Sequence, residues 1–260
     1  IGENRYEWEL AYLSVVCGTG IVVPLDRSLP DNELEELIER SDVEAIFYSK
    51  KYEERIKTIR FSEKNKLKHL ISMDTDIHDE GIYSEKELIE KGRKLIEEGN
   101  REFLDSKINP EEMNIMLFTS GTTSKSKVVA LSHKNLVSNV MDFASVLTID
   151  SSDRILSFLP LHHVFECTVG MLYSLYIGAE RSFCEGIRHI VENLNEYKIT
   201  FASFVPAIYE SMYKTILKNL EKQGKLEAVK KLMEENRDKS MEEKKEIFKD
   251  IHNIFGGNIK

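Results

Sequence analysis

The sequence is short of cysteine, of long apolar runs and of positive charge. Its three cysteines, Cys17, Cys167 and Cys184, lie far apart and form no CxxC pair, so we expect reduced core thiols of a cytoplasmic protein. The longest apolar run, residues 10–25, is interrupted by Ser, Thr, Gly and Pro and is too short to cross a bilayer. The net charge of −9 argues against a general nucleic-acid-binding protein, which needs a basic face.

Internal repeats, low-complexity linkers and the apolar core of a secretory signal peptide are also missing from the sequence. The chain begins with Ile1 rather than methionine, so we expect the natural chain to extend upstream. With 260 residues, 41% of them hydrophobic, the chain is long enough to bury a large core.

Short apolar runs alternate with helical patterns along the chain, and this alternation predicts an α/β fold with mostly parallel sheets layered between helices. A short strand is expected over residues 21–25, and an amphipathic helix over 84–99 with Leu88, Ile89, Leu95 and Ile96 inward. We expect a first α/β subdomain over residues 1–150. Residues 151–260 are expected to form an incomplete second subdomain, with solvated, Lys- and Glu-rich helices at about 214–250.

One polar segment stands between two predicted strands. It contains no apolar side chain and consists of Thr119, Ser120, Gly121, Thr122, Thr123, Ser124, Lys125, Ser126 and Lys127. We call it the hydroxyl-rich segment. Its hydroxyls, lysines and the backbone N–H groups around Gly121 could wrap a polyphosphate. Composition alone favours a solvated turn, because hydroxyl side chains bond their own backbone. A Walker P-loop is disfavoured, because Lys127 is followed by Val128 and a second glycine is missing.

The order of these residues favours a polyphosphate-binding segment over a solvated turn. TSGTTSKSKVVALSHKNL closely resembles the signature TSGTTG-x-PKG-V, followed by S-H-x-N-L, of the adenylate-forming enzymes (acyl-CoA synthetases, adenylation domains and luciferases). The resemblance implies that Thr119, Ser120, Gly121, Thr122, Thr123, Ser124 and Lys127 contact the phosphates of ATP, and that Thr119 contributes to the Mg²⁺ shell. The sequence departs from the signature at Ser124, Ser126 and Val128, which replace Gly, Pro and Gly.

A second informative block is LPLHHVFE, residues 159–166. A histidine and the glutamate at near-helical spacing could bind a metal, but a third ligand at suitable spacing is missing, so zinc is disfavoured. The alternative is two histidines packed at a helix start. The block resembles the one that follows the phosphate signature in long-chain fatty acid–CoA ligases. That resemblance places His163 beside the acyl carboxylate and the adenylate, and extends less directly to His162 and Glu166. His133, just inside a predicted helix, is expected to be a packing residue.

The resemblance implies an ATP-dependent fatty acid–CoA ligase with ATP, Mg²⁺ and coenzyme A as cofactors and Lys127 and His163 as catalytic residues. Two further blocks support it, CGTGIVVPLD and ITFASFVPAI. The family's adenine- and ribose-binding segments and its C-terminal lysine would fall downstream of Lys260, so we expect a central piece that is inactive alone. Alternatives are an acyl carrier protein as acceptor, or a non-catalytic nucleotide- or acyl-binding relative. Peripheral membrane contact and self-association through the incomplete second subdomain are further expectations.

Overall fold

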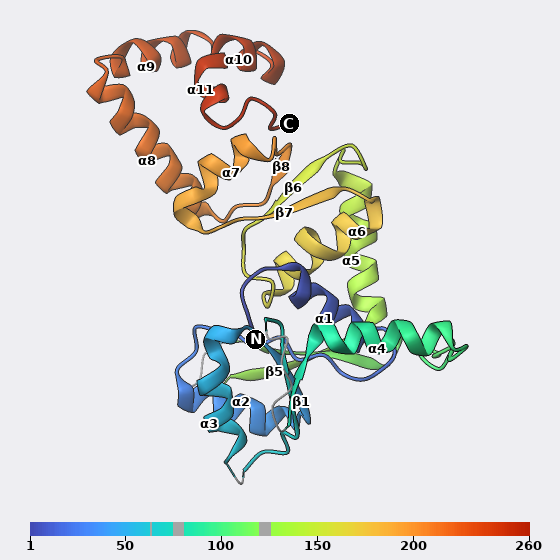
Figure 1. Cartoon of the computed structure of the whole chain (residues 1–260). Helices are drawn as coiled ribbons and strands as arrows, with labels where there is room; N and C mark the ends of the chain where they lie inside the picture. The colour runs from blue at the N-terminus through green and yellow to red at the C-terminus, as the bar shows by residue number, and fades with distance from the viewer. Residues whose placement is uncertain (63, 75–80, 120–125) are drawn as a thin grey trace. The chain divides into compact units, whose positions relative to one another are not determined.

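The computed structural model describes residues 1–62, 64–74, 81–119 and 126–260. The chain forms two compact units (Figure 1). Unit 1 comprises Ile1–Thr148 and Pro160–Tyr176, and unit 2 comprises Ile149–Leu159 and Ile177–Lys260. Unit 2 begins at Ile149. Residues Pro160–Tyr176 nevertheless belong to unit 1, because the π-helix η2 (Glu166–Leu172) packs against helix α5 (His133–Val146).

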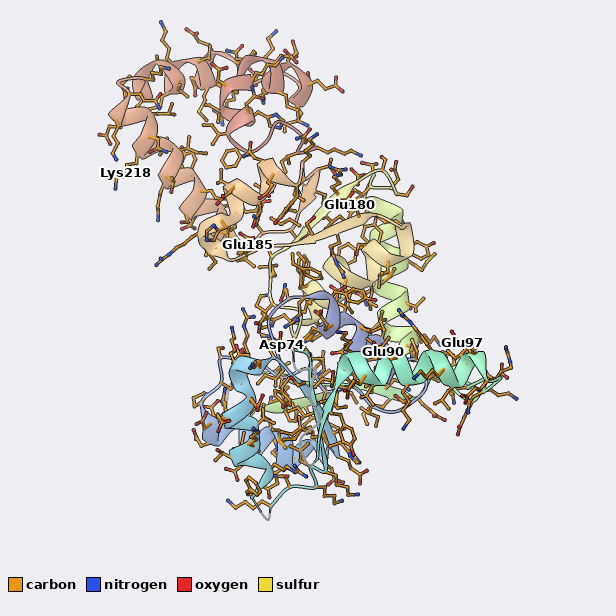
Figure 2. All side chains as sticks on the ribbon, viewed as in Figure 1. Asp74, Glu90, Glu97, Glu180, Glu185 and Lys218 are labelled. Carbon is orange, nitrogen blue, oxygen red and sulfur yellow. The ribbon has the colours of Figure 1, made fainter. Side chains whose placement is uncertain are left out.

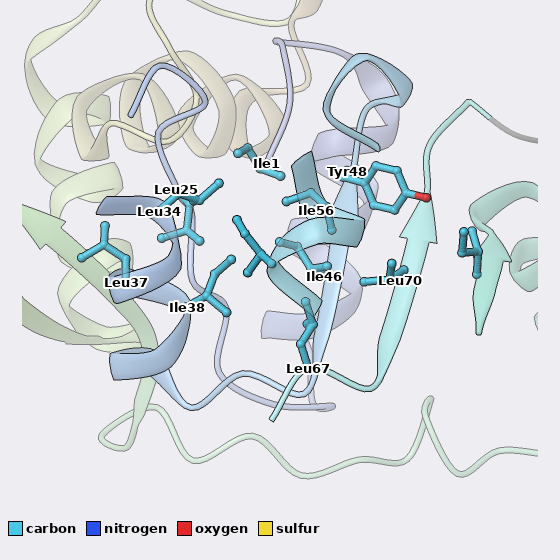
Figure 3. Packing of buried hydrophobic residues seen from close by; sticks show 12 residues of the cluster. Ile1, Leu25, Leu34, Leu37, Ile38, Ile46, Tyr48, Ile56, Leu67 and Leu70 are labelled. Carbon is cyan, nitrogen blue, oxygen red and sulfur yellow. The ribbon is translucent and has the colours of Figure 1, made fainter. Parts of the chain in front are cut away.

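The core of unit 1 is a parallel sheet in the order β1-β2-β3, formed by β1 (Ala45–Tyr48), β2 (His69–Ser72) and β3 (Ile82–Ser84). Helix α2 (Asp31–Ser41) buries Leu34, Leu37 and Ile38 at i, i+3 and i+4 against it. Helix α3 (Glu53–Arg60), entered through the 3₁₀ turn η1 (Lys50–Tyr52), adds apolar side chains to the same cluster, shown in Figure 3. Each fully buried aliphatic side chain contributes about 1.5–3 kcal/mol.

Two more helices belong to unit 1. Helix α1 (Tyr6–Val16) stacks the rings of Trp8 and Tyr12 at 5.7 Å between centroids. Helix α4 (Glu85–Glu97) is capped by the Ser84 hydroxyl, which accepts from the Glu87 N–H. Leu95 and Ile96 are 41% and 51% exposed, so the expectation that they face inward is wrong. Only the first half of α4 is even partly buried, and periodicity cannot show where a helix runs past its neighbours.

An antiparallel ribbon carries the hydroxyl-rich segment. Strand β4 (Met113–Thr119) pairs with β5 (Lys127–Ser132), and α5 follows directly. The strand expected over residues 21–25 is reduced to one parallel bridge between Val22 and Ile115. Its extension stops nearby because Pro24 has no N–H to donate.

Unit 2 contains a second parallel sheet, in the order β7-β6-β8, made of β6 (Arg154–Ser157), β7 (Glu180–Phe183) and β8 (Phe201–Ala202). The turn η3 (Ile187–His189) leads into α7 (Ile190–Glu196), which buries Ile190 and Leu194 beside Leu156 and Ile199. The two parallel sheets flanked by helices confirm the predicted α/β class.

Buried Asp153 ties the elements of unit 2 together. Its carboxylate accepts from the Thr200 hydroxyl at 2.6 Å, the Lys260 ammonium at 2.7 Å and the Asp150 N–H at 2.9 Å. Burial acts to raise the pKa of Asp153, but these donors outweigh it and hold the pKa below its usual range. Asp153 therefore stays ionised at neutral pH and fixes the end of β6.

The charged region forms four consecutive helices, as expected. They are α8 (Pro206–Lys222, with proline in its first turn), α9 (Leu226–Glu235), α10 (Met241–Ile247) and α11 (Lys249–Ile254). None of their residues is fully buried. Among the described helices, none combines the length and apolarity needed to cross a membrane. All three cysteines are free thiols, with Cys167 buried and the other two partly buried.

Candidate functional site

The end of the β4–β5 ribbon brings together two predicted phosphate-binding residues. Thr119 and Lys127 are directly opposed in the antiparallel register, so their side chains stand on one face of the ribbon, with Cβ atoms about 5 Å apart. Both residues are exposed. The ribbon thus presents a hydroxyl and an ammonium side by side, a pair that can bind phosphate oxygens. The predictions for Ser120, Gly121, Thr122, Thr123 and Ser124 fall outside the described residues.

An arginine that sequence reasoning missed contacts both sides of the hydroxyl-rich segment. Arg40, in the last turn of α2, donates from Nη2 to the Ser126 carbonyl at 2.8 Å. Its guanidinium carbon lies 5.4 Å from the centroid of the Phe118 ring. Arg40 therefore reaches the ribbon just before Thr119 and just before Lys127.

The two histidines of the second block differ in environment. His163 is exposed, whereas only 12% of the His162 side chain is exposed, and the ring centroids lie 4.5 Å apart. His162 Nε2 is 3.6 Å from a carboxylate oxygen of Asp26. Burial lowers the pKa of His162 to about 4, against the opposing pull of Asp26, so this imidazole is neutral at pH 7.

Asp26 is held in place by its own turn. Its carboxylate accepts from the backbone N–H of Ser28 at 2.8 Å and from the Ser28 hydroxyl at 2.7 Å. Burial works against ionisation, but these hydrogen bonds and the nearby histidines hold the pKa of Asp26 below its usual range. A fixed carboxylate and a neutral imidazole thus stand behind the exposed His163.

Glu166, by contrast, is turned into the protein. It opens helix η2, is only 2% exposed, and lies so close to Gly170 that a Cβ there would come within 2.4 Å of its carboxylate. Any larger residue at 170 would displace this side chain. A contact between Glu166 and a ligand stays a prediction, whereas His163 is accessible to one.

His133 has the packing role that the sequence suggested. Its Nε2 lies 2.9 Å from the Val16 carbonyl, and at that distance Nε2 must carry the proton and donate. Throughout the described residues, no group of three or more His, Cys, Asp or Glu side chains is placed to hold a metal ion.

A family model described as AMP-binding enzyme matches residues 1–257. The chain belongs to the AMP-binding enzyme family. It is 28% identical over 227 residues to Long-chain-fatty-acid--CoA ligase 1 of Cavia porcellus, which covers 82% of the chain and 32% of that protein. It is also 28% identical over 144 residues to the chloroplastic Long-chain-fatty-acid--[acyl-carrier-protein] ligase AEE15 of Arabidopsis thaliana, covering 54% of the chain and 20% of that protein.

The fold of an AMP-binding enzyme is also seen in the structural comparison. The crystal structure of a long-chain-fatty-acid-CoA ligase (FadD1) from Archaeoglobus fulgidus superposes with a TM-score of 0.71 at 22% identity, covering 84% of this chain and 41% of that one. At that identity the likeness shows the fold alone. The chain spans about a third or less of the length of the curated relatives it matches.

Two sequence blocks of the chain meet in unit 1. Asp26 comes from the VPLD block and His162 from the LPLHHVFE block. Sequence reasoning did not connect them, because the two positions are far apart in the chain and no local spacing relates them. The one available signal was the aspartate that ends VPLD, followed two residues later by Ser28, a pattern typical of a self-bonded Asx turn.

Proposed function

We propose that the intact protein is an ATP-dependent ligase that activates a fatty acid as its adenylate and transfers the acyl group to coenzyme A. The observation that carries the proposal is the pairing of Thr119 with Lys127 at the end of the β4–β5 ribbon, within a chain of the AMP-binding enzyme family. Relatives named as long-chain-fatty-acid–CoA ligases support the fatty acid as substrate.

The first step needs charge stabilisation more than covalent help from the protein. A carboxylate oxygen attacks the α-phosphorus of ATP, the bond to the pyrophosphate oxygen breaks, and acyl-AMP and pyrophosphate form. We assign to Lys127 and Thr119, which are partners in the strand register, the role of stabilising negative charge on the departing phosphates. The Thr119 hydroxyl is a hard oxygen donor that would suit a Mg²⁺ ion, which would supply positive charge at the phosphates.

The second step joins the acyl group to a thiol. The thiol sulfur attacks the acyl carbon, the carbon–oxygen bond to AMP breaks, and a thioester and AMP are released. His163, exposed and backed by the His162 ring, is the residue we assign beside the acyl carboxylate. The relative named as an acyl-carrier-protein ligase supports a carrier protein as the alternative acceptor. We propose the cytoplasm as the site of action.

The test compares two acyl acceptors and also removes one charge, that of Lys127. The intact protein is assayed with palmitate, ATP and either coenzyme A or acyl carrier protein, following thioester and AMP. We expect thioester with coenzyme A, and a fall of about 100-fold in adenylation for Lys127→Ala. Lys134→Ala is the matched control, since this exposed lysine pairs with Glu111 at 2.7 Å and should leave the rate unchanged.

Two outcomes would count against the proposal. Consumption of ATP with neither acceptor loaded would exclude both ligase readings, and absence of nucleotide binding would favour a non-catalytic relative. The 260-residue chain alone is expected to show no ATP–pyrophosphate exchange, and measurable exchange would refute its inactivity.

A further inference from the structure

Arg40 is the one arginine of helix α2, and two of its contacts lie at the hydroxyl-rich segment rather than on its own helix. One guanidinium nitrogen donates to the Ser126 carbonyl, 86 residues away in sequence. The carbon of the same group lies over the Phe118 ring, 5.4 Å from its centroid. Phe118 itself packs against the core cluster of unit 1, so the arginine is braced on a fixed surface.

The plain explanation of Arg40 is helix stability. A cation in the last turn interacts favourably with the helix dipole, and Arg40 also lies 3.5 Å from Glu36 one turn earlier. This ion pair is long, and 31% of the arginine side chain and 43% of the glutamate side chain are exposed. Ion pairs of this kind contribute little to the free energy of unfolding. Neither effect requires Nη2 to reach Ser126 or the guanidinium to lie over Phe118.

We propose that Arg40 is a positioning residue for phosphate binding, holding the two strand ends from which the hydroxyl-rich segment departs. Phe118 precedes Thr119 and Ser126 precedes Lys127, so one side chain fixes the backbone next to each member of the opposed pair. This inference rests on the proposed function, because it concerns the same phosphate site. Its physical basis is that a preformed geometry need not be ordered when the nucleotide binds.

The guanidinium is suited to this task in a way that lysine is not. A planar fork can donate at its edge while its face stacks on an aromatic ring, whereas an ammonium can do only one of these from one position. Arg40→Gln removes the charge and the stacking. Arg40→Lys keeps the charge and should restore part of the effect. Glu36→Gln removes the charge that pairs with Arg40 and leaves both strand-end contacts in place.

The first experiment measures hydrogen exchange of the backbone amides at 117–119 and 127–129 in the nucleotide-free 260-residue chain. We expect exchange about tenfold faster in Arg40→Gln, an intermediate value in Arg40→Lys, and no change in Glu36→Gln. Amides of α5 and β1 should keep their wild-type rates. Unchanged exchange at the strand ends, or a uniform increase across unit 1, would overturn the positioning role.

The second experiment measures the KM for ATP of the intact protein. Arg40→Gln should raise the KM for ATP about tenfold while the KM for palmitate changes less than about twofold, a split that general destabilisation does not produce. Equal ATP affinity in wild type and variant would overturn the inference. If the wild-type protein binds no nucleotide, the proposed function fails, and the exchange experiment still decides whether Arg40 holds the strand ends.

Discussion

At the scale of single residues, Glu85 is the most unusual carboxylate in unit 1. It is the first residue of α4, is 4% exposed, and neither of its carboxylate oxygens has a hydrogen-bond partner among the residues that the structure describes. Burial raises its pKa to about 8. The nearby charge of Glu7 adds to the shift, Arg5 opposes it, and Asp74 adds a smaller part. The side chain is therefore largely protonated at neutral pH.

This shift predicts that unit 1 loses stability as the pH rises. The folded pKa of about 8 exceeds the ordinary value of 4.5, so the stabilisation is fully present below pH 4.5 and disappears as the pH rises through 8. Glu85→Gln should abolish this slope and be more stable than wild type at pH 8 by about 2 kcal/mol. Urea unfolding at pH 5 and pH 8, followed by the fluorescence of buried Trp8, measures it.

Glu90 provides the control for this measurement. It lies on the outer, exposed face of the same helix (Figure 2), so Glu90→Gln should leave the pH slope of the wild type intact. Equal pH slopes in Glu85→Gln and the wild type would show that the Glu85 carboxyl does not stay protonated in the folded protein.

The sequence could predict single residues only where their neighbours in the chain identify them. Thr119, Lys127 and His163 were predicted from the order of adjacent residues; the structure shows Thr119 and Lys127 opposed and His163 exposed, and their roles stay predictions. Arg40 and Asp26 were not predicted, because the contacts that single them out are with distant parts of the chain. Such contacts exist only once the sheet and helices have packed.

At the scale of elements, local signals located most helices well. The capping signal at Ser132 is a case in point. Its hydroxyl accepts from the Asn135 N–H, and the Asn135 side chain accepts in return from the Ser132 N–H at 3.0 Å, forming a capping box at the start of α5. The same signals could not predict that β8 would be only the pair Phe201–Ala202, since strand length depends on the neighbour that supplies hydrogen bonds.

We predict that Ser132→Ala destabilises unit 1 by about 1 kcal/mol, the usual cost of losing such a cap. Urea unfolding followed by Trp8 fluorescence measures the change. Ser138→Ala, at an exposed position inside the same helix, should be neutral or slightly stabilising, because alanine is the better helix former. If the two alanine variants had equal stability, the cap would make no contribution.

At the scale of the whole molecule, the alternation of strands and helices was enough to predict the α/β class. The family match over residues 1–257 agrees with it. What alternation could not predict is the number of strands on each sheet or their order. The sequence order β6, β7, β8 becomes β7-β6-β8 in the sheet of unit 2, because each parallel crossover must return over a helical face.

The apolar surface of unit 2 leads to a prediction for the protein in solution. Ile187 and Ile254 are 68% and 46% exposed, and both line an open cavity of about 590 Å³ together with Met212 and Phe255. Contiguous apolar surface of this kind drives association when a second surface can cover it. We therefore expect the chain to self-associate through unit 2, with sedimentation velocity showing larger species as the concentration rises.

Charge placed at the cavity should reverse this association. Ile187→Glu combined with Ile254→Glu should shift the chain to monomer, because burying these like charges unpaired in a contact would cost several kcal/mol, about 2–5 in typical interfaces. Val146→Lys is the control: this side chain is 73% exposed but belongs to unit 1, so the substitution should leave the association unchanged. A wild-type chain that stays monomeric at every concentration would exclude association through this surface. If Val146→Lys dissociated the chain equally well, the contact would lie elsewhere in the protein.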